Sequence, residues 1–170
     1  MNIKNFFIII FSLFFFNNVL ANENKKIVYI NVDFILNNSI LGKNILNDLK
    51  KINNKNLENI SSTEKELKKE NDEIAKVKNI ISKEEFENRI NDLKKKIDNF
   101  NSLKDKLSIE LNQLRQKEIK NFFKKINPLI QVYMDENFID IIIDKKNIFI
   151  ARSDYDITTD IINLIDNEFK

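Results

Sequence analysis

The residues from Lys43 to about Asn127 form one long stretch that constrains the fold more than any other part of the chain. The stretch contains no Gly or Pro and is dense in Lys, Glu and Asn. Its apolar residues recur every seven positions, the period that keeps one stripe of a helix facing a partner helix. Two such rows follow one another: Ile60, Leu67, Ile74 and Ile81, and then Phe86, Leu93, Phe100, Leu107 and Leu114. The stretch therefore predicts long helices packed through a coiled-coil seam.

A helix-start signal separates the two rows. Ser82 is followed three residues later by Glu85, the spacing at which the two side chains satisfy free backbone amides at the start of a helix. We therefore expect a helix to begin at Lys83 and the stretch, residues 43–127, to fold as an antiparallel hairpin with its tip near 79–83. At 1.5 Å per residue each arm would reach on the order of 50–65 Å, so the arms must project.

The predicted seam is thin. In the first arm the companion positions of the heptad include Thr63 and Glu70, which are polar. The second arm has the stronger coiled-coil signal, because apolar companions at positions 90, 97 and 111 join its row. Apolar residues off the seam are candidates for a face turned toward a cavity: Leu57, Leu103 and Ile109.

The first 21 residues have the build of a cleaved secretory signal peptide. Lys4 is followed by an apolar run from Phe6 to Phe16, and Val19-Leu20-Ala21 precedes a polar stretch. The alternative is an uncleaved membrane anchor, but the run is well short of the ~20 residues that span a bilayer. Of the 28 basic residues one, Lys4, lies in this segment, which leaves 27 basic against 26 acidic residues in the mature chain.

Short strands are predicted at both ends of the mature chain. Residues 26–33 alternate apolar side chains with the period of a strand, and 139–144 and 148–151 read as a hairpin around Lys145-Lys146-Asn147. A helical hairpin would return the chain so that these strands could pair. The body, residues 22–42 and 128–170, is near the ~60 residues at which a lone core is marginal, so we expect subunits to associate through it. The residues expected in this association are Val28, Ile30, Val32, Ile141, Ile143, Ile148 and Ile150.

Two further signals lie in the C-terminal part. Pro128 stands in a stretch that otherwise looks helical, and it is expected either to kink the helix or to end it one residue earlier. Thr158 is expected to cap a final helix with Asp160 in its first turn, where the helix dipole favours negative charge. The predicted fold class is α+β, mostly α: a small β body with a long helical arm.

The tip of the hairpin is chemically distinct. From Ile74 to Lys83 there is no acidic residue, and three lysines alternate with apolar side chains. Such a tip could contact unfolded chains or, transiently, anionic headgroups of a membrane surface. The alternative is that its Ile and Val residues close the end of the coiled coil. The residues concerned are Lys76, Val77, Lys78, Ile80 and Lys83.

Composition argues against catalysis. The chain has no Cys and no His, which excludes thiol and His-dependent nucleophiles and the commonest zinc ligands. Four aspartates near the predicted strands, Asp140, Asp144, Asp154 and Asp156, could suggest paired carboxylates, but Asp is ordinary at turns and strand ends. We expect no enzyme activity, no metal, no cofactor and no nucleic-acid partner.

The two ends of the mature chain resemble the Skp (OmpH-like) family of periplasmic chaperones. The resemblance lies in Lys26-Ile-Val-Tyr-Ile-Asn-Val-Asp33 and in the run from Ile139 to Ile157 with its Asp-Lys-Lys-Asn turn and Asp-Tyr-Asp-Ile-Thr. The order of elements also matches that family along the whole mature chain. The arms match in pattern alone, which any coiled coil could supply.

The resemblance implies a homotrimer whose arms enclose a cavity that holds unfolded outer-membrane proteins without ATP. Many weak contacts on flexible arms would grip chains of differing sequence. Members of that family are often strongly basic, whereas this mature chain is near neutral, so long-range steering of acidic clients would be weak. The alternative is a structural or adaptor coiled coil of the cell envelope. Such an adaptor should keep both heptad rows apolar, unlike Thr63 and Glu70.

Overall fold

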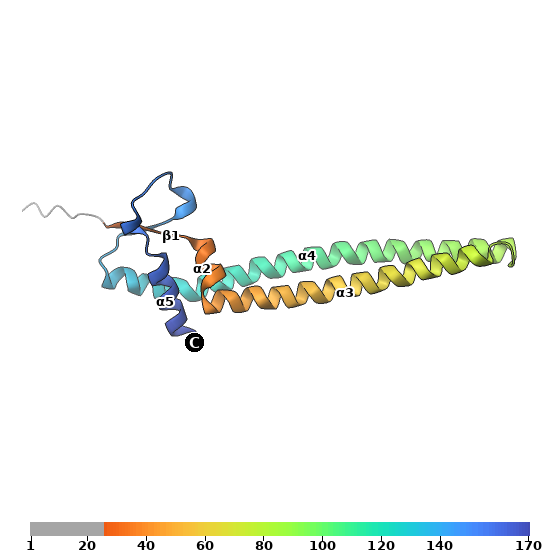
Figure 1. Ribbon diagram of the computed structural model, residues 1–170, viewed down its shortest axis with the longest axis horizontal. Coiled ribbons are helices and arrows are strands. Elements are labelled where there is room, and N and C mark those ends of the chain that lie inside the picture. The colour runs from red at the N-terminus through yellow and green to blue at the C-terminus, as the bar shows by residue number, and fades with distance from the viewer. Residues whose placement is uncertain (1–25) are drawn as a thin grey trace, which may run out of the picture.

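The protein is a long helical hairpin with a small mixed body at one end (Figure 1). The computed structural model describes residues 26–170, so the predicted signal peptide lies outside the described residues. Along the chain the elements are β1 (Ile27–Ile30), α2 (Val32–Asn38), α3 (Ile40–Val77), α4 (Lys83–Glu136), β2 (Ile141–Asp144) and α5 (Thr158–Glu168), with single 3-10 turns at Lys145–Asn147 and Ser153–Tyr155.

Helices α3 and α4 form the arm, and each begins at a serine. The Ser39 hydroxyl accepts a hydrogen bond from the Gly42 N–H at 3.2 Å, and the Ser82 hydroxyl accepts one from the Glu85 N–H at 3.2 Å. The predicted start at Lys83 is therefore confirmed. The Glu85 carboxylate contacts Arg89 at 2.7 Å. One capping interaction thus suffices to set the start of α4.

The seam between the arms is thin, as the heptads of the first arm predict. Ile74, Leu93 and Phe100 are buried, and the other row residues are half-buried. The companion residues Ile90 and Ile97 are 39% and 40% exposed, whereas the companions Leu111, Thr63 and Glu70 are half-buried. A side-chain ion pair crosses between the helices: the Lys96 ammonium lies 2.6 Å from the Glu70 carboxylate.

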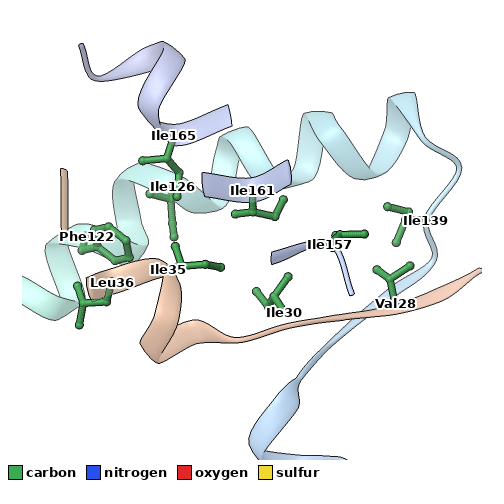
Figure 2. Close-up of a cluster of buried hydrophobic side chains, with 10 residues drawn as sticks. All are labelled: Val28, Ile30, Ile35, Leu36, Phe122, Ile126, Ile139, Ile157, Ile161 and Ile165. Carbon is green, nitrogen blue, oxygen red and sulfur yellow. The ribbon is translucent and has the colours of Figure 1, made fainter. Parts of the chain in front are cut away.

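The body is built from segments more than a hundred residues apart in sequence. β1 and β2 pair in parallel, with Ile27 opposite Ile141 and Ile30 opposite Asp144. Helices α2, α5 and the C-terminal part of α4 pack on one face of this pair (Figures 1 and 2). The expectation that the hairpin returns the chain so that its two ends pair is confirmed. The core comprises Val28, Ile30, Ile35, Leu36, Phe122, Ile126, Ile139, Ile157, Ile161 and Ile165.

The first predicted strand is too long. The strand ends at Ile30, and the Asn31 side chain accepts a hydrogen bond from the Phe34 N–H at 3.0 Å, which caps α2. Val32 is therefore the first residue of a helix and not part of the sheet. Asparagine is among the strongest N-cap residues, and this local signal ends the apolar alternation.

The predicted hairpin of 139–144 and 148–151 is wrong. β2 is followed by a 3-10 turn at Lys145–Asn147, where the Asp144 carboxylate accepts from the Lys146 N–H at 3.2 Å, and residues 148–152 form no strand. A strand is stable only with a hydrogen-bonding partner. Within residues 26–170 β2 pairs with β1 on one edge, and the 3-10 turn at Lys145–Asn147 does not fold residues 148–152 back onto the other edge.

Pro128 does not end the helix, because α4 continues to Glu136. The proline removes one backbone donor, so the carbonyl of Lys124 loses its partner. Lys124 is exposed, where water can replace that hydrogen bond. Phe122, Ile126 and Ile130 pack in the body core on both sides of the proline, and this tertiary packing holds the helix together.

The final helix begins near the predicted residue, but by another contact. Thr158 is its first residue, and its N–H donates to the Asp156 carboxylate at 3.0 Å. The Thr158 hydroxyl instead accepts from the Asn31 N–H at 2.8 Å, which ties the start of α5 to the end of β1. Asp160 lies in the first turn, as expected.

Candidate functional site

The body exposes apolar side chains that the rest of residues 26–170 does not cover. Phe138, Phe149 and Ile150 are 86%, 103% and 84% exposed. Phe138 follows α4 with a backbone φ of 54°, a left-handed conformation that is unusual for a bulky residue. Burying one such side chain is worth roughly 1.5–3 kcal/mol, so each of the three is a candidate contact for a partner molecule.

The small sheet also exposes apolar side chains, on the face that points away from the core. Val28 and Ile30 pack in the core with Ile142, while Ile27 and Ile141 lie opposite each other and are each 44% exposed. β1 is flanked on both sides, by β2 and by a bridge between Tyr29 and Asp156. In the part of the chain that the structure describes, β2 has a strand partner on one edge, so its other edge can accept a further strand.

The structure divides the residues that the sequence predicts for association. Val28 and Ile30 are already buried within one chain, and Val32, Ile143 and Ile148 are half-buried. Ile141 and Ile150 are exposed. Sequence reasoning missed Phe149, which stands in the apolar run of 148–151 and could have been found there. It also missed Phe138, for which no sequence pattern gives a signal.

The aspartates near the strands hold the loops of the body. The Asp140 carboxylate accepts from the Lys26 N–H at 2.7 Å, and Lys145 lies 3.5 Å from the Asp156 carboxylate. Partial burial acts to raise the pKa of Asp156, but hydrogen bonds from the Thr158 hydroxyl and N–H outweigh it, so this pKa lies below its ordinary value. Residues 26–170 contain no cluster of three groups that could hold a metal ion. These carboxylates therefore act as structural groups.

Asp144 is held in the same way. Its carboxylate lies 2.9 Å from the Lys146 ammonium and accepts from the Lys146 N–H. Burial again acts to raise the pKa, and the hydrogen bonds from Lys146 lower it below its ordinary value. Asp144 and Asp156 thus fasten the loop between β2 and α5 at both ends, and this loop presents Phe149 and Ile150.

The tip of the arm combines the two alternatives that its sequence allows. The N–H groups of Ile80 and Ile81 donate to the Val77 carbonyl at 2.9 and 3.2 Å, which closes the turn. Val77 and Ile81 are half-buried at the end of the seam, whereas Ile80 is 79% exposed. Lys76, Lys78 and Lys83 are exposed around it. The tip therefore presents one apolar side chain among cations.

The arm also exposes apolar residues along its length. Leu57 is 55%, Leu103 42% and Ile109 56% exposed, as expected for residues off the seam. Leu103 lies beside a groove between the helices, which Leu67 and Phe100 also line together with the paired Glu70 and Lys96. The arm can thus offer small apolar contacts separated by polar ones.

None of the helices within residues 26–170 combines the length and the apolarity needed to cross a membrane.

Comparison with known proteins identifies the family. A profile of the family described as "Outer membrane protein (OmpH-like)" matches residues 26–165. The crystal structure of a protein from Caulobacter crescentus, described as a candidate outer membrane chaperone (OmpH-like), superposes with a TM-score of 0.79. The two sequences are 18% identical over 86% of each chain, so this likeness concerns the fold. A search of curated proteins finds no match. Because the family profile spans most of the chain, the protein belongs to the OmpH-like family of periplasmic outer membrane chaperones.

Proposed function

We propose that the protein is an ATP-independent holdase that binds unfolded outer-membrane proteins in the periplasm and keeps them from aggregating before membrane insertion. The observation that carries this proposal is the arm: a projecting hairpin whose seam is thin and mostly half-buried, and whose apolar residues off the seam are exposed. Membership of the OmpH-like family supports it. No residue is assigned covalent chemistry, and no cofactor takes part.

The arm suits a client that has no fixed structure. Each exposed apolar contact, such as Leu57, Leu103 or Ile80, is small, and a thin seam lets the two helices adjust to what they hold. Many weak contacts on an adaptable surface bind chains of differing sequence without selecting one. Lys76, Val77, Lys78, Ile80 and Lys83 are the proposed client contacts at the tip, with anionic headgroups of the membrane surface as a transient second partner.

We propose that three copies associate through the body. The exposed Phe138, Phe149 and Ile150, together with Ile141 at the open edge of β2, form the surface for this contact. Val28, Ile30, Val32, Ile143 and Ile148 would support that surface from within each subunit. Association would bury the side chains that one chain leaves exposed, and three arms would then surround a common space.

The adaptor alternative receives less support from the arm. An adaptor that docks by a coiled coil needs a continuous apolar stripe for its partner. On α3 the companion positions are occupied by Thr63 and Glu70, and Glu70 pairs with Lys96 of the same hairpin. A docking partner would have to break this ion pair.

The function is tested by diluting a urea-denatured outer-membrane barrel protein into buffer with and without the mature protein. Light scattering should stay low when the protein is present in a threefold excess of subunits and no nucleotide is added. A matched sample with a globular protein of similar charge controls for crowding. Unchanged aggregation would refute the holdase function.

The assembly has its own test. Static light scattering on the purified mature protein should give about three times the monomer mass at micromolar concentration. Phe149→Ser together with Ile150→Ser should lower that mass, while Ile90→Ser on the arm serves as the control and should leave it unchanged. A stable monomer of the unaltered protein would rule out the trimer.

A further inference from the structure

The near-neutral charge of the chain hides a strong separation of charge along the molecule. We define the arm root as residues 40–57 and 111–127, the part of α3 and α4 that adjoins the body. The root contains nine basic and two acidic residues, whereas the distal arm, residues 58–110, contains 12 basic and 13 acidic residues. The C-terminal part of the body, residues 128–170, contains four basic and nine acidic residues. The positive charge is thus concentrated at the root.

In the part of the chain that the structure describes, six of the 12 cations of the distal arm are paired with a carboxylate, whereas eight of the nine cations of the root are not. On the distal arm Lys69, Lys83, Arg89, Lys95, Lys96 and Lys106 each lie within ion-pair distance of a carboxylate. At the root Lys51 pairs with Asp48 at 2.9 Å. Within residues 26–170 no carboxylate pairs with the other root cations, and all of them are exposed: Lys43, Lys50, Lys55, Arg115, Lys117, Lys120, Lys124 and Lys125. Their charge is therefore available to an external anion.

The root also has a groove in which two of these cations flank an apolar floor. The groove lies between α3 and α4, has a volume of about 340 Å³ and is lined by Leu46, Leu49, Lys50, Asn53, Leu111 and Arg115. Leu49 is 8% exposed and is part of the floor. The corresponding distal groove contains Lys96, whose charge is already neutralised by Glu70 at 2.6 Å. The two grooves thus differ in whether they can accept an anion.

We propose that the root groove binds acidic segments of an unfolded polypeptide, with a carboxylate between Lys50 and Arg115 and a neighbouring apolar side chain on the leucine floor. Arginine and lysine side chains form charge-assisted hydrogen bonds with carboxylates, and the Asn53 amide can hydrogen-bond to an extended backbone. This inference rests on the proposed function and names the kind of segment that the arm holds. The near-neutral chain would then still steer acidic clients, but locally at the root.

A peptide fits this site better than a membrane does. Lys50 precedes the end of α3 at Val77 by 27 residues, which places it roughly 40 Å from the tip along the helix. A flat bilayer would meet the projecting tip first. An extended chain can reach into a groove between two helices and follow the exposed lysines along the root.

The test uses the full mature protein and fluorescence anisotropy with two labelled peptides. One peptide alternates Leu with Asp, and the other has Asn in place of every Asp. The acidic peptide should bind more tightly than the neutral one, and raising salt should weaken it. Lys50→Gln with Arg115→Gln should weaken the acidic peptide about tenfold and leave the neutral peptide unchanged. Lys68→Gln with Lys94→Gln removes the same charge from the distal arm and should have little effect.

Three results would overturn the inference: equal affinity for both peptides, an equal loss in the distal control, or binding of anionic phospholipid vesicles through Lys50 and Arg115 with no peptide binding. All four substituted residues are exposed, and circular dichroism checks that the helices are intact. The same samples are assayed for suppression of barrel-protein aggregation. If that suppression is present in the unaltered protein while the acidic peptide fails to bind, this inference fails and the holdase function stands.

Discussion

The body and the arm are held together in different ways, although one helix, α4, belongs to both. In the body, segments from both ends of the chain and from α4 converge on a core in which Phe122, Ile161 and Ile165 are fully buried. In the arm, a thin seam joins two helices, and most of its side chains are half-buried. The body can therefore hold a defined shape, as the proposed association of subunits requires, while the arm can adjust to the proposed client.

The clearest test of this difference in packing between body and arm is to make the same substitution in both regions. Phe122 in the body is 0% exposed and Phe100 in the seam is 9% exposed, and both lie on α4. Phe122→Ala should cost about 3–5 kcal/mol of unfolding free energy, because the closed core leaves a cavity. Phe100→Ala should cost less, about 1–2 kcal/mol, because the open seam can collapse around the gap. Urea titration followed by circular dichroism measures both. Equal losses would contradict the contrast.

The junction between body and arm is expected to be intolerant of a single methyl group. A Cβ added at Gly42 would lie 2.0 Å from the Leu36 carbonyl oxygen and 2.9 Å from the Ser39 hydroxyl. Gly→Ala inside a helix normally gains up to ~1 kcal/mol, but here it should cost about 1–3 kcal/mol, because α2 and α3 must move apart. Thermal unfolding of Gly42→Ala measures the sign. A stabilised variant would show that α2 and α3 are not closely packed at Gly42.

Acid should loosen the body before the arm. Asp144 and Asp156 have pKa values below those of the unfolded chain, so their contribution to stability is present above the ordinary carboxyl pKa near 3.8 and is lost as pH falls through the lowered values. Asp156→Asn should cost about 1–2 kcal/mol at pH 7, and this difference from the unaltered protein should shrink below pH 4. Urea titrations from pH 7 to pH 3 follow it. A difference that is constant with pH would mean that the charge of Asp156 contributes nothing.

The smallest effect on stability is expected at the tip. Ile80 is 79% exposed, so Ile80→Ser should change the unfolding free energy by less than about 0.5 kcal/mol and yet weaken the protection of a denatured barrel protein. Val77→Ser is the matched control, since the half-buried Val77 should affect the arm's stability as well. If Ile80→Ser protects as well as the unaltered protein, the tip is not a client contact.

The sequence predicts the arm well because the arm is local. Heptad spacing places each seam residue against its partner helix, and the Ser82 cap marks the turn within one residue. It predicts the body less well, because strand pairing depends on residues far apart. The Asn31 cap cuts the first strand short, and the apolar run of 148–151 finds no partner within one chain.

Heptad periodicity predicts only part of the candidate site. The exposure of Ile80 and of Leu57 follows from their places off the seam. The exposure of Phe138 depends on a left-handed residue at the end of α4, which no periodicity predicts. The root groove could be recognised only once α3 and α4 were placed side by side, because each helix contributes leucines and one cation to it.

We propose that the body assembles the protein while the arm holds the client. Hydrogen exchange of the backbone amides, measured with and without a denatured barrel protein, tests this division of roles. Without client, β1, β2 and α5 should exchange slowly and the distal part of α3 and α4 faster. Adding client should increase protection in α3 and in the arm part of α4. Protection in the body, including the C-terminal part of α4, should not change. Increased protection confined to β1, β2 and α5, or none on the arm, would contradict this division of roles.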